Sequence, residues 1–287
     1  MAAGQADIKM TLCDKALHDP ISSLTSLPAA TLAACLTLAG LPAAWADDTI
    51  ATDRPDFVES SDVVGTGRFQ IETSFSSERH NADGVKTRTT STPTLLRMGV
   101  SDKLELRVET DGIVRSRSQD ATGTQRERGF ADASLGVKWH MQDGDDASGK
   151  PGVAWLLHLD VDSGSAAFRG PGLRPSLRAV AEWELPQGFS VGVMPGFVVD
   201  KNADGKRFVG GIMAVVVGKE WTPAWRSFVE LAGQQLASRK NGGSVVTFDT
   251  GVAYLVTKSV QLDFAIARGL TADSPDFQWG MGLSVRF

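Results

Sequence analysis

The chain has 287 residues and a formal net charge of −5, and its mean hydropathy is −0.09. This length allows one large β domain or two small ones. No apolar run reaches the ~20 residues of a membrane-spanning helix, which argues against a helical membrane protein. The acidic balance also gives no electrostatic reason to expect nucleic acid as a partner, because nucleic acid favours a basic surface.

The N-terminal part resembles an export signal. Residues 29–46 read AATLAACLTLAGLPAAWA and are followed at once by two aspartates. The closing AWA has the small-x-small form of a signal-peptidase site, so we expect a signal over residues 1–46, cleaved after Ala46, with Met10 as an alternative start. The LAAC that ends at Cys35 has the shape of a lipoprotein box. The apolar run continues well past this cysteine, which makes a lipid anchor the weaker alternative.

The remainder consists of alternating apolar and polar residues. About twelve segments have this period of two, and each is near the ~9–11 residues that a tilted membrane strand requires. In chain order they are residues 68–79, 94–100, 103–112, 130–141, 153–162, 176–185, 189–199, 208–221, 227–236, 245–256, 260–270 and 277–287. The segment 208–221, with its IMAVVV run, does not alternate cleanly, so its two faces cannot be assigned from the pattern.

The connections between these segments alternate in length. Those after even-numbered strands are mostly tight, such as SDK at 101–103 and TKS at 257–259. Those after odd-numbered strands are mostly longer and polar, such as HNADGVK and RSRSQDATGTQRER. The exception is QDGDDASGKPG, which follows the fourth predicted strand and is long for a turn. Short turns at one end and longer loops at the other are typical of outer-membrane barrels, and an even strand count puts both chain ends in the periplasm. The predicted fold is an all-β, transmembrane, antiparallel up-and-down β-barrel over residues 68–287.

The alternation assigns each strand an outer and an inner face. Leu106, Trp155 and Leu283 are predicted to face lipid, and their polar neighbours Glu105 and His158 to face the lumen. A soluble barrel or sandwich is the alternative fold, but a dry core cannot hold so many charges. The candidate lumen and constriction residues are Arg54, Glu72, Arg97, Glu105, Arg107, Glu109, His158, Asp160, Arg178, Glu182, Glu230, Asp249 and Asp263.

Residues 47–67, which include TDRPDFVES at 52–60, precede the first predicted strand. A proline and four charges make this stretch a poor membrane strand. An extended chain of this length reaches well into a lumen, at ~3.3 Å per residue. We therefore expect a plug whose charges pair with lumen residues such as Arg97, Arg107 and Glu105, with Arg54 as the anchor. The alternative is a disordered periplasmic leader.

The last segment, FQWGMGLSVRF, ends on an aromatic residue. In a closed barrel the last strand pairs with the first, because free edges are not tolerated in lipid. Trp279 and Phe287 are the candidate assembly signal, and the barrel assembly machinery and outer-membrane lipid are the expected partners.

Nothing in the sequence predicts an enzyme, a cofactor or a metal site. There is no G-x-S-x-G motif and no evident pairing of serine with histidine. Asp200, Asn202 and Asp204 have the spacing of half a calcium loop, but Gly211 occupies the twelfth position, where such loops have glutamate. A tight turn explains this stretch better.

Several stretches together resemble a family of proteobacterial outer-membrane proteins named for a MetA-pathway of phenol degradation. They are ATDRPDFVESSDVVGTGRFQIE, LLRMGVSDKLELRVETDG, GFADASLGVKW and VQLDFAIARGLTADSPDFQWGMGLSVRF. The resemblance covers most of residues 51–287. It implies a porin-like barrel in the outer membrane of a Gram-negative bacterium, acting as a transporter or channel for small, aromatic or hydrophobic molecules. A structural or adhesive barrel without transport is the alternative.

Overall fold

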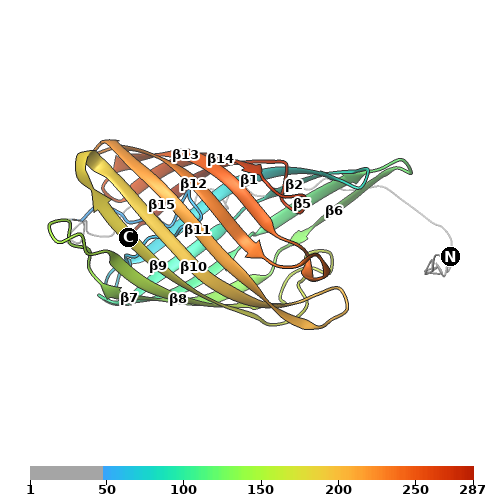
Figure 1. Ribbon diagram of the computed structural model, residues 1–287, viewed down its shortest axis with the longest axis horizontal. Coiled ribbons are helices and arrows are strands. Elements are labelled where there is room, and N and C mark those ends of the chain that lie inside the picture. Colours follow the sequence, from blue (N-terminus) through green and yellow to red (C-terminus); the bar gives the residue numbers. More distant parts are fainter. Residues whose placement is uncertain (1–47) are drawn as a thin grey trace, which may run out of the picture. The chain divides into compact units, whose positions relative to one another are not determined.

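The computed structural model describes residues 48–287. The predicted export signal over 1–46, its alternative start at Met10 and the alternative box at Cys35 lie outside the described residues. A helix long and apolar enough to cross a membrane is not found in the described part of the chain. This part is instead an all-β barrel of tilted antiparallel strands (Figure 1).

Fifteen strand segments and two short 3-10 helices follow one another along the described chain. The strands are β1 (Phe69–Ala82), β2 (Val85–Ser91), β3 (Thr94–Ser101), β4 (Leu104–Thr110), β5 (Ile113–Gln119), β6 (Thr124–Phe130), β7 (Ala133–Gln142), β8 (Gly152–Val161), β9 (Arg174–Leu185), β10 (Phe189–Lys201), β11 (Arg207–Thr222), β12 (Trp225–Leu236), β13 (Val245–Thr257), β14 (Val260–Gly269) and β15 (Phe277–Arg286). The helices are η2 (Pro186–Gly188) and η3 (Arg239–Asn241).

Three barrel strands are interrupted, so the fifteen segments form a closed barrel of 12 strands. The chain passes from β2 into β3, from β4 into β5 and from β6 into β7 through two residues each. The interruptions lie at the same level, because Thr92 N donates to Asp111 O (3.0 Å) and Ala131 N donates to Gly112 O (2.9 Å). Beyond this level β2, β5 and β6 continue, with the end of β1, as a projecting sheet that we call the outer sheet (Figure 1).

The barrel closes between its first and last strands. β1 pairs with β15 from Gln70↔Arg286 to Arg79↔Phe277. The backbones of Phe69 and Phe287 exchange two further hydrogen bonds of 3.2 and 2.8 Å, and their rings stack with centroids 6.5 Å apart. The last residue of the chain therefore completes the pairing that removes the free edge.

The two ends of the barrel differ. The short turns, Phe287 and the start of the described chain lie at one end, where Ile50 N donates to Lys258 O (2.7 Å) in the turn between β13 and β14. We call this the turn end. The outer sheet and most of the longer connections lie at the opposite loop end. The long connection between β7 and β8, residues 143–151, is an exception and lies at the turn end.

The strand faces agree with the predicted alternation. Leu106, Trp155 and Leu283 are 41%, 42% and 39% exposed, whereas Glu105 and His158 are 0% and 3% exposed. The outer surface is a band of exposed apolar side chains, and polar groups turn inward. This is the inverse of a soluble protein and is typical of a barrel in lipid.

The segment that the pattern left unassigned also alternates. On β11, Ile212, Ala214 and Val216 are buried inside the barrel, and Met213 and Val215 are exposed outside it. The sequence could not reveal these faces because both are apolar.

One prediction about the connections is wrong. The stretch RSRSQDATGTQRER was expected to be a loop, but most of it forms β5 and β6, and HNADGVK likewise forms the tip of a hairpin between β1 and β2. Arginine and serine alternate along β5, but both are polar, so the hydrophobic pattern that marks a strand is absent.

Candidate functional site in the barrel lumen

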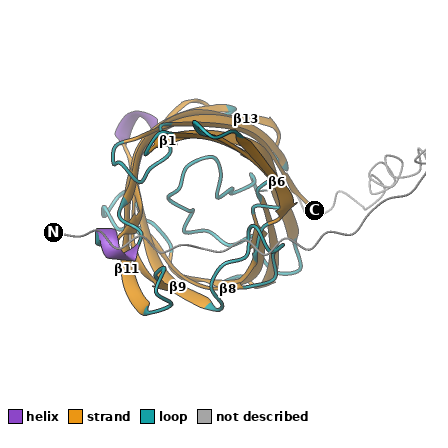
Figure 2. Ribbon diagram, turned by 90° about the vertical axis from the view of Figure 1, so that its right-hand side faces the viewer, coloured by secondary structure: helices purple, strands orange, loops and turns teal. Residues whose placement is uncertain are grey.

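Residues 48–66, which we call the inner segment, form no strand. Their two ends contact turns of the barrel, and the part between them lies inside it. Figure 2, which looks along the barrel, shows loop chain within the ring of strands. The inner segment contacts strands on several sides of the lumen, from Glu72 on β1 to Glu230 on β12 and Asp263 on β14. The predicted stretch TDRPDFVES is the middle of this segment.

Asp53 is the centre of the ionic contacts. One carboxylate oxygen lies 2.6 Å from Arg107 and 3.4 Å from Arg97, and the other accepts from Lys138 Nζ at 2.7 Å. The backbone N–H of Ser60 also donates to it at 2.9 Å, which closes the inner segment on itself. One carboxylate thus faces three cations, from β3, β4 and β7.

A second layer of carboxylates balances these cations. Arg97 lies 2.8 Å from Glu72 and 2.8 Å from Glu105, and all three side chains are fully buried. Arg97 also donates to two backbone carbonyls of the inner segment, at Ala51 (2.9 Å) and Asp62 (3.0 Å). Buried charges persist only where they are paired and hydrogen-bonded, so the inner segment and the wall depend on each other here.

Glu59 links the inner segment to two further strands. Its carboxylate lies 2.6 Å from Arg107 on β4 and 2.8 Å from Arg178 on β9. Arg178 also lies over the ring of Phe57, 5.6 Å from the centroid. Arg178 is therefore held by two residues of the inner segment, one acidic and one aromatic.

Wall carboxylates also accept backbone N–H groups of the inner segment. Glu230 accepts from Phe57 (2.8 Å) and Val58 (2.7 Å). Glu182 accepts from Ser61 at 2.5 Å, and Glu105 accepts from Val64 at 2.9 Å. These hydrogen bonds fix a backbone that has no strand partner of its own.

Arg54 is the predicted anchor, and the structure gives it fewer ionic contacts than its neighbour Asp53. Arg54 makes one ion pair, with Asp263 at 3.0 Å, and its side chain is 21% exposed. Asp53 makes three ion pairs with fully or almost fully buried cations. The physical reason is that the lumen level reached by the segment is rich in cations, so an acid makes more pairs there than a base.

The charge states in the inner segment follow from the same contacts. Burial would raise the pKa of Asp53, but Arg97, Lys138 and Arg107 together hold it well below its usual range. Burial likewise opposes ionisation of Glu59, yet Arg107 and Arg178 keep its pKa below the ordinary value. Both carboxylates are therefore ionised at neutral pH.

Part of the lumen wall is formed by apolar side chains. Val58 of the inner segment packs into a cluster of buried side chains, which we call the apolar wall. Its members are Ala154, Leu156, Val180, Met194, Ala214, Val216, Phe228 and Ala232, on β8 to β12. Phe57 packs against the same cluster. The lumen wall thus has a charged cluster around Asp53 and an apolar patch flanked by Arg178, Glu182 and Glu230, and the inner segment presents matching groups to each.

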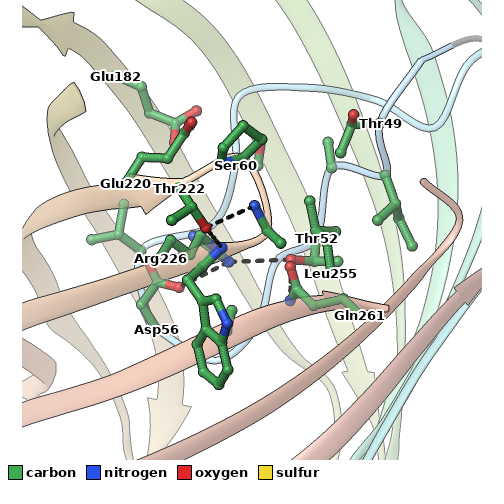
Figure 3. A pocket seen from close by; sticks show the side chains of 17 residues that line it. Thr49, Thr52, Asp56, Ser60, Glu182, Glu220, Thr222, Arg226, Leu255 and Gln261 are labelled. Atoms are coloured by element: carbon green, nitrogen blue, oxygen red, sulfur yellow. Dashed lines mark hydrogen bonds and ion pairs between the residues drawn. The ribbon is translucent and has the colours of Figure 1, made fainter. Parts of the chain in front are cut away.

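Cavities lie on both sides of the inner segment. At the turn end a cavity of about 240 Å³ is lined by Thr52, Asp56 and Ser60 of the segment and by Arg226 and Gln261 of the wall (Figure 3). Toward the loop end a cavity of about 180 Å³ is lined by the other side of the segment, including Asp53, Phe57 and Glu59.

A larger cavity of about 460 Å³ opens at the loop end. It is lined by four of the predicted site residues, Glu109, His158, Asp160 and Arg178. These residues form a vestibule above the Asp53 cluster, and Arg178 connects the two through Glu59. Asp249 lies elsewhere, opposite Glu230 on the neighbouring strand, where it accepts from Thr247 at 3.1 Å.

Some contacts at this site carried a weak signal or none in the sequence. Lys138 is predicted to face inward by the alternation, but nothing in the pattern indicates that it meets Asp53. Gln70 and Gln261, which donate to Ala51 O (2.8 Å) and Thr52 Oγ1 (2.9 Å), give no such signal, because inward glutamines are ordinary lumen residues. Among residues 48–287 no three histidine, cysteine, aspartate or glutamate side chains are grouped as metal ligands.

Three solved structures are similar to this chain, and the likeness to the first of them shows the fold. The COG4313 outer membrane channel from Pseudomonas putida F1 is 13% identical with a TM-score of 0.58, over 79% of this chain and 98% of that chain. The KdgM porin in complex with disordered oligogalacturonate is 8% identical with a TM-score of 0.49, over 76% and 99%. The translocator domain of the autotransporter NalP from Neisseria meningitidis is 13% identical with a TM-score of 0.48, over 78% and 89%.

A search among curated proteins finds no significant match. The family model described as "Putative MetA-pathway of phenol degradation" matches residues 52–287. This range starts within the inner segment and ends at the last residue, so it includes both the lumen contacts and the closing strand. The chain therefore belongs to this family of barrel proteins.

Proposed function

We propose that the protein is an outer-membrane channel for small apolar or aromatic molecules, closed in the present conformation by its inner segment. The turn end faces the periplasm and the loop end faces the cell exterior. The observation that carries the proposal is the inner segment itself, which is bound across the lumen by Asp53 on one side and by Val58 on the other. The matched outer-membrane channel fold supports it.

The apolar wall supports the substrate class. A pore for hydrophilic solutes gains nothing from Leu156, Val180 and Met194 at mid-height, because water-filled lumens are polar. An apolar surface beside a few polar groups is typical of sites for small organic ligands. When Val58 and Phe57 withdraw, the surface they leave is suited to an aromatic ring.

A reversible cross-link tests the gate. A Cβ at Gly192 on β10 would lie 3.0 Å from Val58 Cγ1, so the two positions are close enough to attempt a disulfide, whose Cβ atoms lie ~3.5–4.5 Å apart. The added Cβ would also lie 2.9 Å from Val216 Cγ1, so the Val216 side chain must shift slightly in this variant. The double variant Val58→Cys/Gly192→Cys should be silent in planar bilayers when oxidised and should open when reduced. The two single variants are the controls. Equal conductance of the oxidised and reduced double variant would rule out the inner segment as the gate.

A second recording tests the substrate class. Sodium benzoate should interrupt the ion current of the reduced channel at concentrations where sodium acetate does not, because only the aromatic ring binds the apolar wall. Leu156→Gln/Met194→Gln should weaken the benzoate effect at least fivefold. If benzoate and acetate act alike on the unmodified wall, the substrate class is wrong even where the gate is right.

A further inference from the structure

Seven basic side chains share one face of the outer sheet, and we call them the basic patch. They are Arg79 on β1, Lys86 and Arg88 on β2, Arg115 and Arg117 on β5, and Arg126 and Arg128 on β6. All seven are exposed, whereas the intervening Thr87, Ser116 and Ser118 are half-buried. None of these seven side chains takes part in the contacts between the inner segment and the lumen wall.

The cations lie directly beside one another. Arg79 is the register partner of Arg88, Arg88 of Arg117, and Arg117 of Arg126. With strands ~4.8 Å apart, these four arginines form one row about 14 Å long. Arg115 and Arg128 form a second pair on the same face, on the side of the first row nearer the barrel.

No carboxylate of the described residues is paired with this row. Within residues 48–287 none of the seven side chains is in an ion pair with a carboxylate. Glu78 and Glu127 alternate onto the opposite face of their strands. Like charges placed opposite each other on a sheet are destabilising, so this arrangement is best explained by an anion outside the chain.

The basic patch lies at the loop-end border of the apolar band on the outer surface. Arg79 is the register partner of Phe277, a 38% exposed residue of the outer barrel surface. Ile113 and Phe130 are cross-strand partners and are 36% and 62% exposed. Arg115 and Arg128 follow two residues on, about 7 Å along the strands. The cations therefore begin where the hydrocarbon ends and headgroups begin.

Protection of a free edge explains only part of the patch. Charged residues on an edge strand prevent unwanted pairing, and β6 is the end of the outer sheet, so Arg126 and Arg128 fit this role. β2 and β5, however, are paired on both sides. Arg88 and Arg117 therefore stand at no edge.

We propose that the basic patch binds the phosphate groups of the phosphorylated glycolipid that forms the outer leaflet. Guanidinium groups form bidentate, charge-assisted bonds to phosphate, and a row of four can hold two phosphates of one headgroup at once. This contact, on the side of the barrel where the strands are interrupted, would fix the depth and the rotation of the barrel in the membrane. This inference rests on the proposed orientation in the outer membrane but not on conduction, so it can fail or hold independently of the gate.

The test is binding of purified protein in nanodiscs to diphosphorylated lipid A, followed by native mass spectrometry. The unmodified protein should bind diphosphorylated lipid A at least tenfold more tightly than it binds dephosphorylated lipid A. Each cation near an anionic lipid surface contributes roughly a fivefold gain in affinity. The variant Arg79→Gln/Arg88→Gln/Arg117→Gln/Arg126→Gln should therefore lose at least tenfold.

The matched control removes four exposed cations from other loop-end positions. These are Lys206→Gln, Arg207→Gln, Arg239→Gln and Lys240→Gln, and binding should change less than twofold. Should the quadruple variant fail to fold, Arg88→Gln/Arg117→Gln alone should still lose at least threefold. Equal losses in patch and control variants, or equal affinity for the dephosphorylated lipid, would overturn the proposal. The proposal would also be overturned if the patch variant lost binding to a soluble acidic polysaccharide but kept its binding to lipid A.

Discussion

At the scale of single residues, the site depends on one carboxylate. Asp53 meets Arg97, Arg107 and Lys138, and nothing else in the inner segment faces as many cations. The sequence allowed the prediction that charges of this segment pair with Arg97 and Arg107. It could not rank Asp53 above Arg54, because the ranking depends on which lumen charges lie at the same height.

Neutralising Asp53 should release the inner segment. Asp53→Asn leaves three buried cations without their shared anion, and removing one partner of a buried pair costs about 3–5 kcal/mol. We expect the open probability in single-channel recordings to rise at least tenfold. Asp62→Asn is the control, because the Asp62 side chain is exposed in the same segment. An equal effect of the two variants would show that the charge of Asp53 is not the anchor.

The pH dependence has a defined sign. Because the pKa of Asp53 is held well below its usual range, its contribution to closure is fully present above the ordinary aspartate pKa of about 4. It is lost only as the pH falls through the lowered value. Acidification from pH 7 to pH 4 should therefore leave the Asp53 contacts intact. Hydrogen exchange can follow this, because the backbone N–H of Ser60, which donates to Asp53, should stay protected. Loss of that protection near pH 4 would contradict the assignment.

Small residues on the inner face of β15 make room for the inner segment. A Cβ at Gly282 would lie 2.7 Å from Arg54 Nε and 2.6 Å from Asp263 Oδ2, whereas a Cβ at Gly280 would meet only Phe75 O at 3.5 Å. Gly282→Val should break the Arg54–Asp263 pair and raise the open probability severalfold. Gly280→Val on the same face should not. Identical conductance traces from both variants would count against the Arg54 contact.

At the scale of elements, the strands whose two faces differ in polarity could be predicted, and those with similar faces could not. β4 and β15 alternate between lipid and lumen residues, and both were expected from the sequence. β5 and β6 were expected to be a loop, because alternation between arginine and serine contains no hydrophobic signal. The faces of β11 stayed unassigned for the converse reason, since its inner face contributes to the apolar wall.

The assignment of faces predicts a depth-dependent cost. Leu106→Arg places a charge on the lipid face in mid-strand and should destabilise the barrel by about 2–4 kcal/mol in urea unfolding from vesicles. Trp221 is 67% exposed near the turn end of β11. Trp221→Arg should cost about 0–1 kcal/mol, because a charge near the interface reaches water. Equal costs for the two variants would mean that the lipid band is misplaced.

At the scale of the whole molecule, the sequence predicts that the first and last strands pair to close the barrel. It predicts only in part how the inner segment blocks the lumen. Pairing of the first and last strands follows from the alternation that runs to Phe287. The path of the inner segment does not follow, because its contacts join Asp53 to Lys138 and Val58 to Glu230 across long stretches of sequence. Such pairings are set by the shape of the lumen, which no local pattern records.

The most direct test of the account is single-channel conductance with and without residues 51–60. The deletion removes Asp53, Val58 and Glu59 and leaves all strands of the barrel in place. Heat-modifiable migration in gels should show that the shortened protein still folds. The account predicts a conductance several times that of the full chain, with fewer closures. Equal conductance of the two folded proteins would contradict the claim that the inner segment closes the channel.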